Sequence, residues 1–287
     1  MNLTQSGNLV HIFVGIFFSA IAGSLWAQGN QGQSEATAEL CLIAGEGVTL
    51  RSGSSMLLMD GLFREGFPED KLPSAALMSK IENAESPYDM VDLVTVSHNH
   101  IDHFGIDSIA KFLHNNESAS LLLPPEAADE FTSAGHQQLA GRILPVYPQR
   151  GSSQMVSVAG IELEIFNLDH ASEVENIGIF FELAGSTFFH MGDFMAADLA
   201  SNGIAGLQVD YLLLPYWYLR TEENFQLIES NMEVGQYIPI HLPAADLPED
   251  FAERVGGFDK LLSDVRGRTE NVILLYQEEE CLELGEG

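Results

Sequence analysis

Short apolar runs separated by Gly and Ser turns dominate the chain after its first 37 residues. Between residues 38 and 63 these runs have strand length, which predicts a meander of short strands. Further strands are predicted at 91–97, 120–123, 142–147, 210–215, 236–240 and 271–277, with hairpins at 155–167 and 177–190. Helices are predicted at 72–84, 108–114, 124–134, 222–231 and 251–263. Because strands and helices alternate in two similar halves, the pattern predicts an α/β sandwich with helices outside two sheets.

The first 34 residues differ in composition from the rest, because the first charged residue is Glu35. Within them, residues 9–27 form a 19-residue stretch that is apolar except for three side chains, and a polar run follows it. This order is typical of a secretory signal peptide. We therefore expect a signal peptide at residues 1–27 and a protein that is exported, either to the periplasm or out of the cell.

After cleavage, residues 28–37 are predicted to be a flexible start of the mature chain, and residues 38–287 one folded domain. Cleavage after Ala22 is an alternative, because Ala20 and Ala22 form an A-x-A pattern. A second alternative is an uncleaved segment that anchors the chain in a membrane, since about 20 apolar residues span a bilayer.

The chain is strongly acidic, with 42 Asp and Glu against 12 Lys and Arg and a formal charge of −30. Binding to nucleic acid depends on Lys and Arg that displace counterions from the phosphates, so this balance argues against a nucleic-acid partner. An anionic membrane surface would repel the chain for the same reason. Hydrophobic residues nevertheless make up 46% of the chain, which is enough to form a folded core.

The two cysteines, Cys41 and Cys281, lie near the two ends of the predicted domain. In an oxidising compartment such a pair can form a disulfide. The sequence does not show that their Cα atoms approach within about 7 Å, which a disulfide requires. We therefore expect two separate thiols, with a disulfide as the alternative.

Four potential metal ligands lie within six residues, directly after the predicted strand at 91–97. In an extended segment His98, His100 and Asp102 project to one side, and a turn after them brings His103 to the same place. Imidazole nitrogens and carboxylate oxygens suit Zn²⁺ and similar divalent ions. The end of a buried strand is also a usual location of sites in α/β proteins. The pattern predicts a metal site, and a set of surface histidines on a loop is the alternative.

This segment, His-Asn-His-Ile-Asp-His-Phe-Gly, resembles the HxHxDH motif of the metallo-β-lactamase fold hydrolases. The resemblance covers about residues 39 to 277 and implies a four-layer αββα sandwich, in which two mixed sheets lie between outer helices. Three later residues match the remaining ligands of that family, namely His170, Asp193 and His241. His190 is a residue that a lactonase-like and phospholipase D-like branch often carries. Phe194 stands where that branch commonly has Thr, so we expect altered surroundings for Asp193.

The resemblance implies that seven side chains hold two ions. The first ion would be bound by His98, His100 and His170, the second by Asp102, His103 and His241, and Asp193 would bridge them. Seven nitrogen and oxygen ligands are too many for one tetrahedral ion, but they suit two ions that keep open positions for water and substrate. We expect two Zn²⁺ ions, with Mn²⁺ or Fe²⁺ as alternatives.

Four further residues are expected to support this site. Asp60 and His190 would fix the ring tautomers of the ligating histidines, and a turn Asp and a buried strand His are the alternative interpretation. By the layout of the family, Tyr216 and Trp217 would lie near the ions. We expect both aromatic residues to line a substrate pocket, while a role in packing is an equal interpretation.

Hydrolysis is the majority activity of the family. Two ions about 3.5–4 Å apart can share a hydroxide, and Asp102 and Asp193 would orient it as the nucleophile. A true β-lactamase is disfavoured by the bridging carboxylate, and nucleic-acid processing is disfavoured by the charge. We therefore expect hydrolysis of a phosphodiester, lactone or other ester of a small molecule or lipid. The alternatives are a non-catalytic binding protein that retains the fold and a metal-dependent oxidoreductase of the same fold.

Overall fold

A computed structural model describes residues 37–170, 174–195 and 199–285. The predicted signal peptide at 1–27 lies outside these residues, as does nearly all of the predicted flexible segment at 28–37, so both stay predictions. Among the helices of the described part, none is long and apolar enough to cross a membrane.

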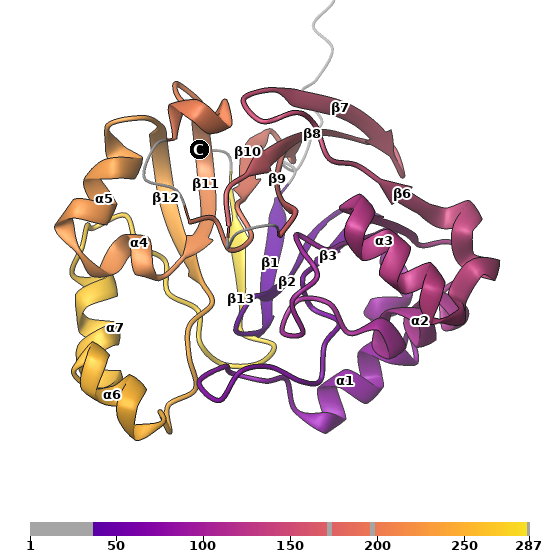
Figure 1. Cartoon of the computed structure of the whole chain (residues 1–287), viewed down its shortest axis with the longest axis horizontal. Helices are drawn as coiled ribbons and strands as arrows, with labels where there is room; N and C mark the ends of the chain where they lie inside the picture. The colour runs from indigo at the N-terminus through magenta and orange to yellow at the C-terminus, as the bar shows by residue number, and fades with distance from the viewer. Residues whose placement is uncertain (1–36, 171–173, 196–198, 286–287) are drawn as a thin grey trace, which may run out of the picture. The chain divides into compact units, whose positions relative to one another are not determined.

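The first of two mixed sheets contains seven strands in the spatial order β13-β1-β2-β3-β4-β5-β6 (Figure 1). Its strands are β1 (Ala38–Ala44), β2 (Gly47–Ser52), β3 (Ser55–Met59), β4 (Leu93–Thr95), β5 (Ser120–Leu123), β6 (Ile143–Pro145) and β13 (Cys281–Leu284). Neighbours from β13 to β3 are antiparallel, as the predicted meander requires. Neighbours from β3 to β6 are parallel.

The second sheet contains six strands in the order β12-β11-β10-β9-β8-β7. Its strands are β7 (Ser153–Val158), β8 (Ile161–Leu168), β9 (Asn176–Leu183), β10 (Ser186–His190), β11 (Gln208–Pro215) and β12 (Glu233–Ile240). The two predicted hairpins are β7–β8 and β9–β10, which are antiparallel, whereas β10, β11 and β12 are parallel.

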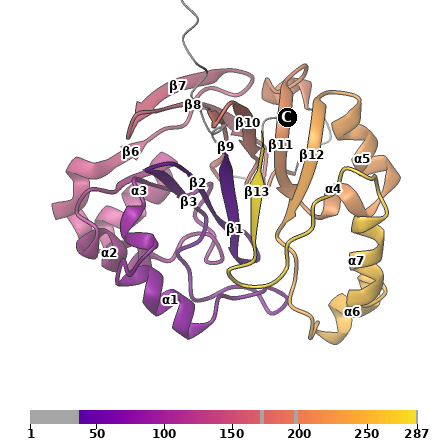
Figure 2. The same ribbon diagram turned by 180° about the vertical axis from the view of Figure 1, so that it is seen from behind.

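Helices cover the outer face of each sheet, so that the fold has four layers (Figures 1 and 2). The first sheet is covered by α1 (Ala75–Glu82), α2 (Ile106–Asn115) and α3 (Pro125–Phe131), and the second by α4 (Trp217–Arg220), α5 (Glu222–Glu229), α6 (Glu249–Val255) and α7 (Phe258–Arg266). Short 3₁₀ or π turns lie at Tyr88–Met90, Thr132–His136, Gln137–Arg142 and Ala200–Asn202.

The alternation along β3 shows how the sequence builds these layers. Leu57 and Met59 pack between the two sheets, whereas Met56 and Leu58 pack against α1 and α2. Successive side chains of a strand point to opposite faces, so apolar residues on both faces require a cover on each side. The predicted αββα sandwich is confirmed.

The single helix predicted at 251–263 is wrong, because the structure has two helices there. Gly256 and Gly257 separate α6 from α7, and both have positive φ angles of 79° and 90°. Gly adopts this left-handed backbone without the steric cost that other residues incur. Two adjacent residues of this kind therefore end one helix before the next begins.

The last strand predicted at 271–277 is also wrong. This segment makes a single bridge, from Val272 to Tyr237 in β12, supported by two hydrogen bonds to the Tyr237 backbone. Pro239 stands two residues further along the same edge of β12 and has no N–H to continue the ladder. The last strand is instead β13, which pairs with β1.

The expectation of two separate thiols is wrong as well, because Cys41 and Cys281 form a disulfide. The two residues lie directly opposite each other on β1 and β13, with Cα atoms 4.0 Å apart. The disulfide therefore ties β13, an edge strand of the first sheet, to its neighbour.

Candidate metal centre

The predicted ligands meet at one edge of the sandwich because each follows the carboxyl end of a strand. His98 follows β4, His170 follows β8, Asp193 follows β10 and His241 follows β12. β8, β10 and β12 belong to the second sheet and run in the same direction. Backbone hydrogen bonds join the edge where they end to the first sheet. One of these bonds runs from His241 N to the Gly45 oxygen, at 2.9 Å. Carboxyl ends of strands are a common location of active sites in such sheets.

The motif itself forms a turn that starts earlier than predicted. The backbone nitrogen of His103 donates to the oxygen of His100 at 3.0 Å, so the chain bends at His100 instead of after Asp102. As a result, Asp102 lies with His103 and not with His98. Gly105 closes the turn, where a Cβ atom would lie 2.5 Å from the Leu62 carbonyl oxygen. Only glycine fits this close approach of two backbone segments.

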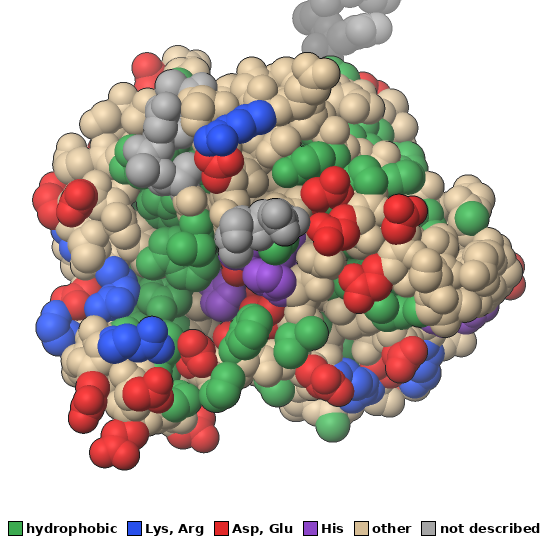
Figure 3. Space-filling model, in the orientation of Figure 1, with side chains coloured by type: hydrophobic (Ala, Val, Ile, Leu, Met, Phe, Trp, Pro, Cys, Tyr) green, Lys and Arg blue, Asp and Glu red, His purple; other side chains and the backbone are tan. Residues whose placement is uncertain are grey.

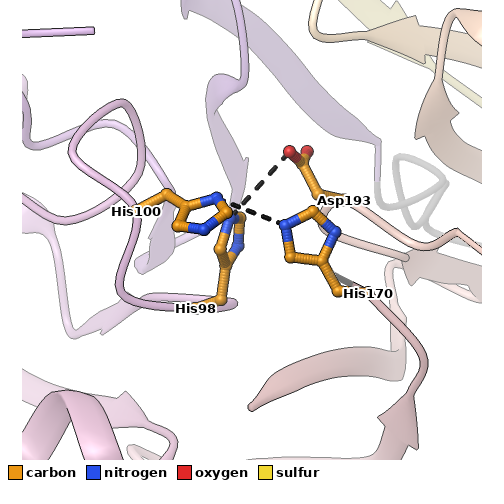
Figure 4. A group of neighbouring side chains, drawn as sticks. All are labelled: His98, His100, His170 and Asp193. Atoms are coloured by element: carbon orange, nitrogen blue, oxygen red, sulfur yellow. Dashed lines mark hydrogen bonds and ion pairs between the residues drawn. The ribbon is translucent and has the colours of Figure 1, made fainter. Parts of the chain in front are cut away.

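The first cluster consists of His98, His100, His170 and Asp193, whose donor atoms lie within 4.8 Å of one another. Figure 4 shows the three imidazoles and the carboxylate turned toward a common centre. Nε2 of His170 is 3.2 Å from Nδ1 of His100, and Nε2 of His98 is 3.9 Å from the nearer oxygen of Asp193. The structure therefore brings together the predicted ligands of the first ion.

The second cluster consists of Asp102, His103, His241 and a residue that was not predicted, Glu46, within the same 4.8 Å limit. Nε2 of His241 lies 3.2 Å from an oxygen of Asp102 and 3.2 Å from one of Asp193. Nε2 of His103 lies 3.3 Å from the other Asp193 oxygen. Asp193 thus faces both clusters, which is the placement expected of a bridging ligand.

Several potential metal-ligating atoms at this centre are buried without a hydrogen bond to any described residue. They include Nε2 of His98, Nε2 of His103 and both carboxylate oxygens of Asp102. Buried polar atoms are almost always hydrogen-bonded, so each exception calls for a partner of another kind. Imidazole nitrogens and carboxylate oxygens converging on two points fit divalent metal ions.

The electrostatics of the centre also favour cations. Burial lowers the pKa of His98 well below its usual value, and burial lowers that of His170 too, so both rings are neutral and able to ligate. Burial opposes the charged form of His241, but Asp193 and Glu46 outweigh it and raise the pKa of His241 well above the usual value. The pKa of His103 is likewise raised, against its burial, by Asp193 and Asp60. Protons on these two rings balance the carboxylates, and divalent ions at the same place would supply that positive charge instead.

Asp60 lies behind the second cluster, as predicted. One of its oxygens is 2.9 Å from Nδ1 of His103 and accepts a hydrogen bond from Oγ of Ser97, and the other accepts from the Ser97 backbone nitrogen. The same Ser97 hydroxyl lies 3.0 Å from Nδ1 of His98. His190 is buried beside this network, but its Nε2 is 3.9 Å from Asp60, which is too long for a hydrogen bond.

Glu46 was missed because it occupies an ordinary-looking two-residue turn, Gly45-Glu46, between β1 and β2. Its side chain is fully buried, with Oε1 3.2 Å from Nδ1 of His241. Burial raises the pKa of Glu46, and the facing imidazole of His241 opposes this shift in favour of the carboxylate form. The sequence around Glu46 does not indicate its burial, because His241 comes from a distant strand.

A cavity of about 360 Å³ is lined by His241 and by both predicted pocket residues, Tyr216 and Trp217. The centroids of the Trp217 and His241 rings are 5.2 Å apart. The remaining wall includes Phe67, Asp70, Met195, Phe251 and Arg254. Figure 3 shows hydrophobic side chains gathered beside the histidines on this face. Burial raises the pKa of Asp70 to about 6, so this carboxylate stays largely ionised at neutral pH and takes up a proton in mildly acidic solution.

Solved structures resemble the chain over most of its length at low sequence identity. Igni18, a metallo hydrolase from Ignicoccus hospitalis, is 15% identical with a TM-score of 0.53, over 86% of this chain and 98% of that one. An isothiocyanate hydrolase from Delia radicum gut bacteria is 14% identical with a TM-score of 0.53, over 86% and 99%. CmlA, a diiron β-hydroxylase from Streptomyces venezuelae, is 12% identical with a TM-score of 0.55, over 88% and 55%. These likenesses show a shared fold.

Sequence comparison leads to the same family. No curated protein matches the chain. A family model described as "Beta-lactamase superfamily domain" matches residues 72–249, more than half of the chain. The chain belongs to the beta-lactamase superfamily and has the fold of its metal-dependent hydrolases.

Proposed function

We propose that the protein is a dinuclear metal-dependent hydrolase of a phosphodiester, lactone or other ester of a small molecule or lipid. The observation that carries this proposal is the pair of ligand clusters that share Asp193. Two divalent ions, for which we propose Zn²⁺, would lower the pKa of a water between them and polarise the substrate oxygen.

The residues of the chain have distinct tasks in this reaction. Asp102 and Asp193 face the centre with carboxylate oxygens and would orient the attacking water and accept its hydrogen bonds. Asp60 and Ser97 hold the rings of His103 and His98 from behind, so that the nitrogens facing the centre keep their lone pairs available.

The cavity beside His241 indicates which part of a substrate the protein would bind. Aromatic and aliphatic side chains form most of its wall, and its volume of about 360 Å³ lies within the usual range for ligand pockets. We therefore place an apolar arm of the ester against Tyr216 and Trp217, with the bond to be cleaved toward the metal ligands. An acyl chain or an aromatic ring has this chemistry.

Export is the second part of the proposal. The apolar segment at residues 9–27 is typical of a signal peptide, and the Cys41–Cys281 disulfide supports an oxidising compartment. We propose a periplasmic or secreted protein that works on a small-molecule or lipid-derived ester, without a nucleic-acid partner.

A substrate panel tests the activity. Zn²⁺- or Mn²⁺-loaded protein should hydrolyse bis(p-nitrophenyl) phosphate, lactones or p-nitrophenyl esters, and His98→Ala and Asp193→Ala should each lower kcat/KM at least about a hundredfold. His114→Ala is the matched control, because His114 is exposed on α2. Unchanged turnover in both site variants would contradict the proposal. Iron in the protein, with an oxidation in place of hydrolysis, would favour the oxidoreductase.

A further inference from the structure

Glu46 is a buried carboxylate that the proposed reaction does not yet use. It is fully buried, and apart from the 3.2 Å approach of Oε1 to Nδ1 of His241 neither of its oxygens has a partner among the described residues. Glu82, the other buried glutamate among the described residues, accepts hydrogen bonds from Arg64, Ser108 and Lys111. A buried carboxylate with so few partners is costly, so its presence calls for a role that a neutral residue would not fill.

The turn that carries Glu46 also holds the backbone of His241. The Gly45 oxygen accepts a hydrogen bond from His241 N at 2.9 Å. A Cβ atom on Gly47 would lie 2.7 Å from Cα of Gly61, so the turn is packed directly against the backbone after β3. His241 itself has a φ angle of 60°, a conformation that non-glycine residues rarely adopt without support from their surroundings. The β1–β2 turn therefore fixes where His241 stands.

The same turn fixes how the ring of His241 is oriented. Nδ1 faces Oε1 of Glu46 at 3.2 Å, while Nε2 faces Asp102 and Asp193 at 3.2 Å each. A carboxylate on one imidazole nitrogen keeps the proton there and leaves the lone pair of the other nitrogen for a metal ion. It also raises the basicity of the ligating nitrogen.

The first cluster has no equivalent arrangement among the residues described. Nδ1 of His98 faces the neutral hydroxyl of Ser97, and Nδ1 of His170 faces no carboxylate among the described residues. In the second cluster both imidazoles have a carboxylate behind them, Asp60 for His103 and Glu46 for His241.

We propose that Glu46 is a positioning residue that acts through His241 and sets the affinity of the second cluster for a divalent ion. The inference rests on the metal-binding part of the proposed function and is independent of which ester is cleaved. Glu46 would act on the second ion alone, because its carboxylate reaches His241 and no residue of the first cluster.

The test measures two stepwise Zn²⁺ affinities by competition with a chromophoric chelator. Glu46→Gln keeps the size and an acceptor oxygen but removes the charge, and Glu46→Leu removes the acceptor as well. We expect one of the two affinities to fall about 10-fold in Glu46→Gln and about 100-fold in Glu46→Leu, with the other unchanged. In Co²⁺-loaded protein, the absorption bands of one site should shift in the same order. Glu117→Gln, an exposed acid without a described partner, is the charge-matched control.

The outcomes separate the possible roles of Glu46. Equal losses in the Gln and Leu variants would overturn positioning in favour of direct ligation. Equal weakening of both ions, or two unchanged affinities, would overturn the inference altogether. If Glu46→Leu fails to fold by circular dichroism, the isosteric Glu46→Gln carries the test alone. A wild-type chain that binds fewer than two ions would overturn the proposed function and this inference together, whereas unchanged affinities in a two-ion chain would overturn the inference only.

Discussion

The two ligand clusters contain the same number of side chains but differ in charge. The first has three imidazoles, whereas the second has two imidazoles and the carboxylate of Asp102, and the carboxylate of Asp193 faces both. The difference continues behind the ligands, where the first cluster has Ser97 and the second has Asp60. Two neighbouring sites at one edge of the fold are therefore built for unequal chemistry.

One sequence motif supplies side chains to both clusters because a turn divides it. His98 and His100 bring imidazole nitrogens to the first cluster before the chain bends away, while Asp102 and His103 follow the bend and join the second. Imidazole-rich sites suit zinc and similar ions, and carboxylates also accept harder ions such as Mn²⁺. We expect the second site to tolerate a wider range of metals than the first.

The largest effect should come from removing one imidazole from each cluster. His170→Ala should abolish tight binding of the first ion and His241→Ala that of the second, because each change removes a ligand nitrogen. Each variant should then hold about one ion per chain by elemental analysis after dialysis, and kcat should fall at least about a hundredfold. Each variant serves as the control for the other. Loss of both ions from both variants would contradict two separable sites.

The smallest effect on the metal sites should come from Glu82, a buried carboxylate that faces neither cluster. Burial opposes its ionisation, but Arg64, Ser108 and Lys111 outweigh it and lower the pKa of Glu82 to about 2 from the ordinary 4.5. Its contribution to stability is therefore complete above about pH 4.5 and is lost as the pH falls toward about 2. Glu82→Gln should lower the free energy of unfolding at pH 7 by about 1–3 kcal/mol.

Urea unfolding at pH 7 and pH 3 checks this effect. The gap between wild type and Glu82→Gln should shrink at the lower pH, and both should bind metal alike. A gap that is independent of pH, or a loss of metal from the variant, would contradict a purely structural role. That result would also weaken the contrast with Glu46, the buried carboxylate that has no such partners.

The sequence predicts the centre well where residues are close along the chain or follow a strand. His98, His100, Asp102 and His103 share one motif, and the apolar alternation placed the strands that end at the other ligands. Glu46 could not be predicted, because its burial depends on His241, which a distant strand carries to the same edge. The local sequence around this glycine-rich turn does not indicate that contact.

The errors in the carboxyl-terminal part have a similar origin. The segment 271–277 is more apolar than Cys281–Leu284, yet the shorter segment became the strand because β1 was available to pair with it. The disulfide depends on that pairing, so it was missed for the same reason. The pocket wall was predicted only in part, since Phe67 and Phe251 come from segments that meet only in the folded chain.

The central claim is that two divalent ions lie at this edge and share Asp193. A crystal structure of Zn²⁺-loaded protein, with anomalous scattering recorded at the zinc edge, tests it most directly. We predict two peaks about 3.5–4 Å apart on either side of the Asp193 carboxylate, one beside His170 and one beside His241. A single peak, or ions bound away from Asp193, would contradict the account.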